Sequence, residues 1–184
     1  NQDTMLIREV TDVIERFAPL AWQESYDNAG LIVGRPDDEV HRALLAVDVT
    51  DEVMAEAERE GCDMVITHHP IVFHALKRFN SADQVQRCVE RAIRGGIALY
   101  ACHTNLDSAP EGMSWRLAEM LGVGDLRVLQ PAQADEKVGF GVVGELSAAV
   151  ATVEFMRRMQ RVLGVRVVRH SDIASPEVRR VAVC

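Results

Sequence analysis

Met64-Val65-Ile66-Thr67-His68-His69-Pro70 places two histidines and a proline directly after a short run of apolar and β-branched residues. Such a run, when turn-forming residues bound it, is typical of a buried strand. A second run, Ile97-Ala98-Leu99-Tyr100-Ala101-Cys102, is followed by His103-Thr104-Asn105-Leu106-Asp107. A helical pattern over residues 82–94, closed by Gly95-Gly96, lies between the two runs. Strand, helix and strand form a βαβ unit, whose two strands we expect to be parallel.

Both polar clusters therefore fall at the carboxyl ends of neighbouring strands, the edge at which open α/β sheets bind ligands. Adjacent side chains within a strand point to opposite faces, so His68 and His69 converge only where the strand has ended. Pro70 supplies that end, because it lacks the backbone N–H and favours an extended His69. Asp48, near the carboxyl end of an earlier apolar run, is expected at the same edge.

Imidazole nitrogens and the Asp107 carboxylate at one sheet edge have the chemistry of a divalent-metal site. An isolated histidine is more often an ordinary polar loop residue. Here, however, four of the six histidines lie between residues 68 and 103, and three of those follow predicted strands. His68 and His69 either share one ion or divide between two ions with Asp107 bridging. Asp27 and Asn28, in contrast, are interpreted as ordinary turn residues.

Composition excludes several classes of protein. The chain has 184 residues, of which 48% are apolar, enough for one large or two small domains. No apolar run approaches the roughly 20 residues that span a bilayer, and no signal peptide is visible. The net charge is −8 with no stripe of basic residues, which argues against a duplex-binding surface. Arg87, Arg91 and Arg94 recur at helical spacing, which is typical of a solvated face.

The cysteine pattern indicates the cellular compartment. The four cysteines are Cys62, Cys88, Cys102 and Cys184, and no two of them form a C-x-x-C pair. Zinc-finger and thioredoxin-like interpretations are therefore not supported. Without a secretion signal, we expect reduced thiols and a cytoplasmic location.

The remaining pattern predicts an α/β fold, with a mixed or parallel sheet flanked by helices and the metal site at the carboxyl ends of the strands. The near-continuous apolar run over residues 43–47 predicts a parallel strand buried on both faces. From Leu126 the character changes to short strands around one helix, with a strand expected over Val165–Val168. We therefore predict a first α/β half over residues 1–124 and the start of a second, incomplete half over residues 125–184.

Several of these motifs together resemble one known family. They are Ser25-Tyr26-Asp27-Asn28-Ala29-Gly30-Leu31, Leu45-Ala46-Val47-Asp48-Val49-Thr50, Ile66-Thr67-His68-His69-Pro70, Ala101-Cys102-His103-Thr104-Asn105-Leu106-Asp107 and Gly141-Val142-Val143-Gly144-Glu145-Leu146. The chain resembles the Ngg-one-interacting-factor-three-like family (domain of unknown function 34), whose members are often named GTP cyclohydrolase 1 type 2 homologues. The motifs keep the family order and cover essentially the whole chain.

The resemblance implies a dinuclear metal site. By similarity, His68 and His69 are metal ligands and Asp107 bridges or binds both ions. His103 lies near the ions, either as a residue that supports a ligand or as an acid/base residue. The family also forms toroidal hexamers and continues past the strand that matches residues 180–184. That further segment carries a histidine and a glutamate that complete the ligand set, and this sequence lacks them.

These features lead to a metal-dependent hydrolase as the preferred hypothesis, with two divalent ions (zinc, iron or manganese) and a nucleotide or another phosphorylated small molecule as substrate. The first alternative is a non-catalytic metal-binding scaffold or regulatory partner, because fold and metal do not establish catalysis. The second is a nucleophilic hydrolase that uses Cys102 and His103, although adjacent residues on a strand diverge.

Overall fold

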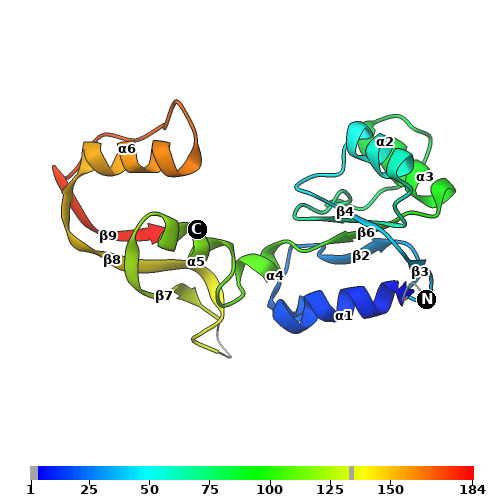
Figure 1. The fold of residues 1–184 in the computed structure, drawn as a ribbon, viewed down its shortest axis with the longest axis horizontal. Helices are drawn as coiled ribbons and strands as arrows, with labels where there is room; N and C mark the ends of the chain where they lie inside the picture. The colour runs from blue at the N-terminus through cyan, green and yellow to red at the C-terminus, as the bar shows by residue number, and fades with distance from the viewer. Residues whose placement is uncertain (1–3, 133–134) are drawn as a thin grey trace. The chain divides into compact units, whose positions relative to one another are not determined.

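The structure, a computed structural model, describes residues 4–132 and 135–184 and consists of two compact units, Asn1–Leu106 and Asp107–Cys184 (Figure 1). The boundary falls earlier than the one drawn after residue 124 from the sequence. The reason is helix α5 (Met113–Met120), which packs against strands of the second unit. The sequence pattern showed that a helix was present there but not which sheet it covers.

A mixed four-stranded sheet forms the centre of the first unit, with the strand order β2-β6-β5-β4. Its strands are β2 (Gly30–Val33), β4 (Ala43–Ala46), β5 (Met64–Thr67) and β6 (Ala98–Ala101). The pairs β4–β5 and β5–β6 are parallel, whereas β2 runs antiparallel to β6. The βαβ unit predicted from the double histidine is therefore confirmed. Two short strands, β1 (Met5–Leu6) and β3 (Glu39–Val40), pair separately.

Helices cover both faces of this sheet. The helices of the unit are α1 (Ile7–Phe17), the short 3-10 helix η1 (Leu20–Trp22), α2 (Asp51–Glu60), α3 (Gln84–Gly95) and, after β6, the short α4 (Thr104–Asp107). Figure 1 shows α2 and α3 together on one side and α1 on the other. Successive side chains of β6 contact the helices on opposite faces of the sheet. Leu99 belongs to the core beneath α2 and α3, whereas the Tyr100 hydroxyl donates a hydrogen bond to Glu15 of α1 at 3.2 Å.

The two helices that flank β5 have well-defined ends. Thr50 accepts a hydrogen bond from the Val53 N–H at the start of α2, and Asp83 accepts one from the Gln86 N–H at the start of α3. Gly61 and Gly96 end these helices in the left-handed conformation, each with a φ of 64°. Each helix therefore stops where the chain must turn back into a strand.

Arginines of α3 connect it to α2. The guanidinium of Arg87 pairs with Asp51 at 2.8 Å, and that of Arg91 pairs with Glu58 at 2.7 Å. The basic face that the sequence placed in solvent thus contributes two ion pairs between helices. Such partly exposed pairs contribute at most about 1 kcal/mol each.

Strand β4 differs from the sequence prediction of a strand buried on both faces. Leu44 packs against the core beneath α2 and α3, but the neighbouring Leu45 is 74% exposed and Val47 is 62% exposed. The prediction was wrong because β4 is an edge strand of the sheet, and the helix on the opposite side does not cover it. A continuous apolar run does not distinguish an edge strand from a central strand.

The second unit is an antiparallel sheet with the order β7-β8-β9. It comprises β7 (Val123–Pro131), β8 (Gly139–Ala151), β9 (Glu177–Val183) and the helices α5 and α6 (Thr152–Leu163). Phe155 of α6 and Val142 of β8 belong to its core. The expected strand at Val165–Val168 is absent from this described segment, because β9 is the strand that pairs with the free side of β8.

The helices offer no candidate for a bilayer-spanning segment within residues 4–132 and 135–184, because none is both long and apolar enough.

The alternation of buried and exposed leucines in the first unit generates a prediction. Replacing Leu99, which is 1% exposed, by alanine should lower the free energy of unfolding by about 2–5 kcal/mol, through lost burial and a residual cavity. The matched change Leu45→Ala should cost less than about 0.5 kcal/mol, because that side chain is already in water. Urea unfolding followed by Trp22 fluorescence in a Trp115→Phe background measures both. Equal losses for the two variants would contradict the described sheet.

Candidate metal centre

The ends of three neighbouring strands are held together just before the site. Thr67 and Ala101 are paired in the parallel register of β5 and β6, so the residues that follow them leave the sheet at the same level. The Cys102 N–H donates to the Thr67 carbonyl at 2.8 Å, and the His69 N–H donates to the Val47 carbonyl at 3.0 Å. These backbone hydrogen bonds fix the positions from which the histidine side chains project.

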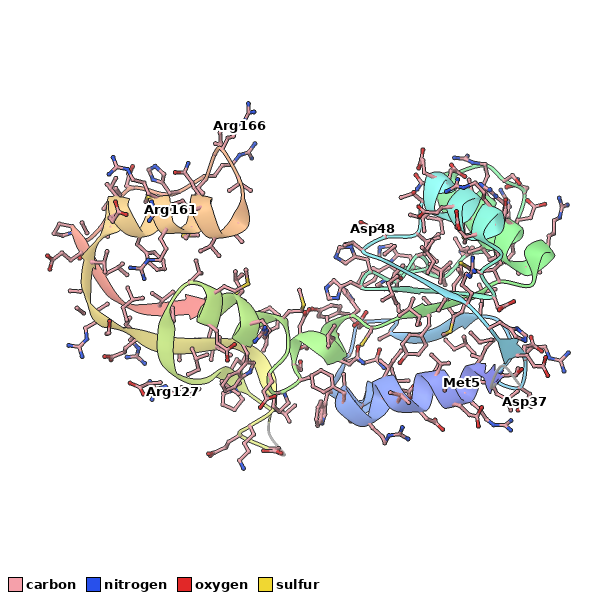
Figure 2. All side chains as sticks on the ribbon, in the orientation of Figure 1. Met5, Asp37, Asp48, Arg127, Arg161 and Arg166 are labelled. Carbon is pink, nitrogen blue, oxygen red and sulfur yellow. The ribbon has the colours of Figure 1, made fainter. Side chains whose placement is uncertain are left out.

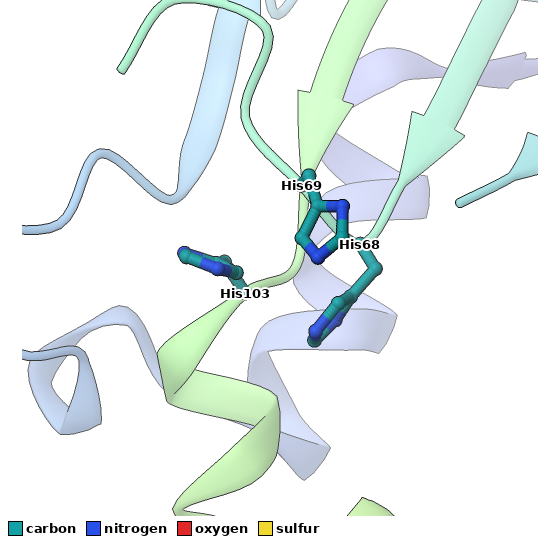
Figure 3. A group of neighbouring side chains, drawn as sticks. All are labelled: His68, His69 and His103. Carbon is teal, nitrogen blue, oxygen red and sulfur yellow. The ribbon is translucent and has the colours of Figure 1, made fainter. Parts of the chain in front are cut away.

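Three histidines lie together at this edge. His68, His69 and His103 each offer one ligand atom, and these atoms lie within 4.8 Å of one another. The ring centroid of His68 lies 4.9 Å from that of His69 and 5.2 Å from that of His103. Figure 3 shows the three rings beside one another where β5 and β6 end. His69 is exposed and the other two are half-buried, so the group is accessible from solvent.

Each of the three rings has a hydrogen-bond acceptor at its Nδ1 atom. His68 Nδ1 lies 3.0 Å from the Cys102 carbonyl oxygen, His69 Nδ1 lies 2.7 Å from Asp48 Oδ1, and His103 Nδ1 lies 2.8 Å from Asp27 Oδ1. A carbonyl or carboxylate oxygen only accepts, so Nδ1 must carry the proton in all three rings. In a neutral ring, Nε2 is then the unprotonated nitrogen. Histidines that bind metals are oriented by this same kind of outer hydrogen bond.

Asp27 is the most strongly held of these acceptors. Its side chain is fully shielded from solvent, and it accepts hydrogen bonds from His103 Nδ1, the Asn28 N–H at 2.6 Å, the Thr104 N–H at 3.0 Å and the Thr104 hydroxyl. Burial alone raises the pKa of the Asp27 carboxyl, but the hydrogen bonds from His103, Thr104 and Asn28 outweigh it and lower that pKa below its ordinary value. Asp27 is therefore an anion beside His103.

Asp48 has the same role for His69 in a more open position. It lies after β4 on the segment that leads to α2, and its side chain is 57% exposed (Figure 2). The sequence placed Asp48 at this sheet edge. It gave no comparable indication for Asp27, which was interpreted as a turn residue. Asp27 is separated from His103 by 76 positions, and no local spacing links the two.

Asp107, the predicted bridging ligand, is half-buried at the last position of α4 and is the first residue of the second unit. It is not in the three-histidine group, so its role as a ligand stays a prediction. His103, predicted as an acid/base residue, lies inside the group of ligand atoms. Cys102 is 6% exposed, and its sulfur accepts from Asn105 at 3.7 Å, whereas His103 Nδ1 is bonded to Asp27. This arrangement does not provide the nucleophilic pair considered from the sequence.

An α/β unit with three neighbouring histidines at the carboxyl edge of its sheet has a set of nitrogen ligands that could hold a metal ion. The chain itself belongs to the Duf34/NIF3 (NGG1p interacting factor 3) family, whose profile matches residues 5–184. The family expected from the sequence motifs is thereby confirmed.

Curated proteins are similar to this chain in sequence over most of its length. A protein named GTP cyclohydrolase 1 type 2 homolog from Clostridium perfringens is 30% identical over 179 residues, which are 97% of this chain and 68% of the relative. A relative with the same name from Streptomyces coelicolor is 35% identical over 154 residues, covering 83% of this chain and 54% of the relative. The chain thus spans between about half and two thirds of the length of these two proteins.

A solved structure supports the same fold. The crystal structure of a Staphylococcus aureus hypothetical protein is 25% identical, with a TM-score of 0.88, and the match covers 98% of this chain and 71% of that one. The mixed α/β architecture is therefore shared with a protein that was determined experimentally.

The hydrogen bonds of the two aspartates predict different effects on stability. Asp27→Ala should lower the free energy of unfolding by about 1–3 kcal/mol, because it leaves the partly buried donors of His103 and Thr104 without their acceptor. Asp48→Ala should change it by less than about 0.5 kcal/mol, because water replaces that exposed carboxylate. Urea unfolding of the metal-free protein measures both values. An equal loss in the two variants would show that Asp27 is not the buried acceptor described above.

Proposed function

We propose that the protein is a metal-dependent hydrolase whose first ion is held by His68, His69 and His103. The observation that carries this proposal is the histidine group itself, in which one ring nitrogen of each residue lies within 4.8 Å of the others and the Nδ1 hydrogen bonds hold the three rings in place. Three neutral imidazoles with a position left for water or substrate are a common ligand set of catalytic metal sites.

The number and identity of the ions are further parts of the proposal. Three imidazoles suffice for one ion, and a second ion requires carboxylate ligands, of which Asp107 is the candidate implied by the family resemblance. Imidazole and carboxylate ligands suit zinc, iron and manganese. A divalent ion at this position supplies Lewis acidity, which lowers the pKa of water and polarises a substrate oxygen.

The residues around the histidines prepare the site for this chemistry. The side chains of Asp27 and Asp48 hold the rings of His103 and His69 in one orientation and make their Nε2 atoms better donors to a metal. The Cys102 carbonyl does the same for His68 without a charge. We assign His103 to metal binding on this basis, and proton transfer is its alternative role.

The proposed substrate is a nucleotide or another phosphorylated small molecule. The support is that the curated relatives carry the name GTP cyclohydrolase 1 type 2 homolog. The hexameric assembly and the cytoplasmic location that the sequence led us to expect both stay predictions. A non-catalytic metal-binding scaffold is the alternative function, and the activity measurement below separates it from the hydrolase.

Metal binding by the three histidines is directly measurable. Calorimetric titration with Zn²⁺ or Mn²⁺ should show an affinity that falls at least about tenfold in His68→Ala, His69→Ala and His103→Ala, because each removes one Nε2 ligand. His74→Ala is the matched control, since His74 is exposed on the next loop and outside the ligand group. Unchanged affinity in all three site variants would rule out the centre. If only His103→Ala retains the metal, His103 is the acid/base residue instead.

Hydrolysis itself is tested with the metal-loaded protein on a panel of nucleotides and phosphoesters. We expect turnover that is lost in His68→Ala and retained in His170→Ala, which changes an exposed histidine of the second unit. A protein that binds metal tightly but releases no product from any member of the panel would favour the scaffold over the hydrolase.

A further inference from the structure

Two aromatic side chains of the first unit lie in water next to the histidine group. Tyr26 precedes β2 and is 63% exposed, and Phe73 follows β5 and is 40% exposed. Their ring centroids are 6.4 Å apart, with the ring planes inclined by 59°. Neither ring is buried in the core, so each leaves apolar area open to a ligand.

Both aromatic residues are connected to the candidate metal centre. The Phe73 ring lies edge-on to the His103 ring, with centroids 6.3 Å apart and planes at 88°. Tyr26 immediately precedes Asp27, whose carboxylate accepts from His103 Nδ1. A molecule that rests on these rings is therefore adjacent to the group that is proposed to hold the metal.

The two segments that carry these rings are fixed to each other. The Asn28 side-chain amide donates to the Val72 carbonyl at 2.6 Å, which joins the loop before β2 to the loop after β5. The Ala29 N–H donates to Gln23 Oε1 at 3.0 Å, which closes the first loop on itself. Tyr26 and Phe73 are thus held at one separation before any ligand arrives, and little order needs to be created on binding.

We propose that Tyr26 and Phe73 form a subsite that stacks a planar heteroaromatic ring, such as a nucleobase, beside the metal centre. The proposal rests on the proposed function and narrows its substrate class to molecules that contain such a ring. Every nucleobase can stack on an exposed aromatic side chain, because stacking uses the flat face of the base and not the hydrogen-bonding groups at its edge. An aliphatic phosphoester has no such face and would gain no binding energy from stacking on these rings.

The charge on the same loop suits a ring that carries a phosphate. Lys77 and Arg78 follow Phe73 by four and five residues and are both exposed. Within the described part of the chain neither of them forms an ion pair. Their positive charge complements the phosphate group of a nucleotide, although the subsite is defined by the ring and not by the phosphate.

The test compares two probes on the metal-loaded protein by calorimetric titration. Guanosine 5′-monophosphate contains a base, and ribose 5-phosphate lacks it. Phe73→Leu and Tyr26→Ala should each weaken binding of guanosine 5′-monophosphate by about tenfold, the effect of one lost stacking contact. Binding of ribose 5-phosphate should be unchanged, and Tyr26→Phe should restore the affinity because it keeps the ring.

Phe79→Leu is the matched control. Phe79 is an aromatic residue of the same loop and is 60% exposed, but it lines a cavity with Leu31 and Ile93 to which neither Tyr26 nor Phe73 contributes. We expect this variant to bind guanosine 5′-monophosphate like the unmodified protein. Equal loss in Phe79→Leu, or equal loss of both probes in Phe73→Leu, would overturn the subsite.

Metal titration of the same variants separates this proposal from the proposed function. Metal affinity that is unchanged in Phe73→Leu, with unchanged binding of guanosine 5′-monophosphate, overturns the subsite and leaves the metal centre standing. If the unmodified protein binds no metal, the proposed function fails. In that case the affinities of guanosine 5′-monophosphate and ribose 5-phosphate are compared on the metal-free protein. A loss in Phe73→Leu that affects only guanosine 5′-monophosphate would still support the subsite, and no such loss would overturn it. A change in oligomeric state in Tyr26→Ala without any base-dependent difference would identify the rings as a contact between copies.

Discussion

The parallel pairing of β5 and β6 is the constraint on which the candidate site depends. It sets Thr67 level with Ala101, so that His68 and His103 follow neighbouring strands at the same edge. The fold thus brings together parts of the chain that are far apart in sequence, since His68 and Cys102 are 34 positions apart. The crossover helix α3 makes this pairing reachable, because Asp83 begins it and Gly96 ends it in time for β6 to start. Strand β5 itself ends at Thr67, so His68 and His69 both lie beyond the regular strand, and their ring centroids are only 4.9 Å apart.

A second requirement is that the three rings present the same nitrogen. Three acceptors of different origin meet it: a backbone carbonyl from Cys102, an exposed carboxylate from Asp48 and a shielded carboxylate from Asp27. Asp27 differs from the others because it also joins the loop before β2 to the start of α4 through Thr104. The same carboxylate therefore contributes to stability and to the orientation of His103, and the aromatic residue before it lies next to Phe73.

Much of this arrangement was predictable from the sequence, because the determining signals are local. The apolar runs before His68 and His103, the helix between them and the following glycines predict the βαβ unit and the histidines at its edge. Asp27 could not be assigned, since it meets His103 only through the tertiary fold. The exposure of Leu45 was missed for a similar reason: an apolar run does not reveal whether a strand lies at the edge of a sheet. The partner of α5 depended on tertiary packing as well, and this moved the boundary between the units to Leu106.

The most direct test of the account is the tautomeric state of the three histidines in the metal-free protein, measured by long-range ¹H–¹⁵N correlation NMR near pH 8. The account predicts that His68, His69 and His103 are neutral with the proton on Nδ1, and that the Nε2 resonances of these rings shift when one equivalent of Zn²⁺ is added. His74 and His170 provide internal references outside the ligand group. Protons on Nε2 in the three rings, or Nε2 resonances that do not respond to Zn²⁺, would contradict the central claim.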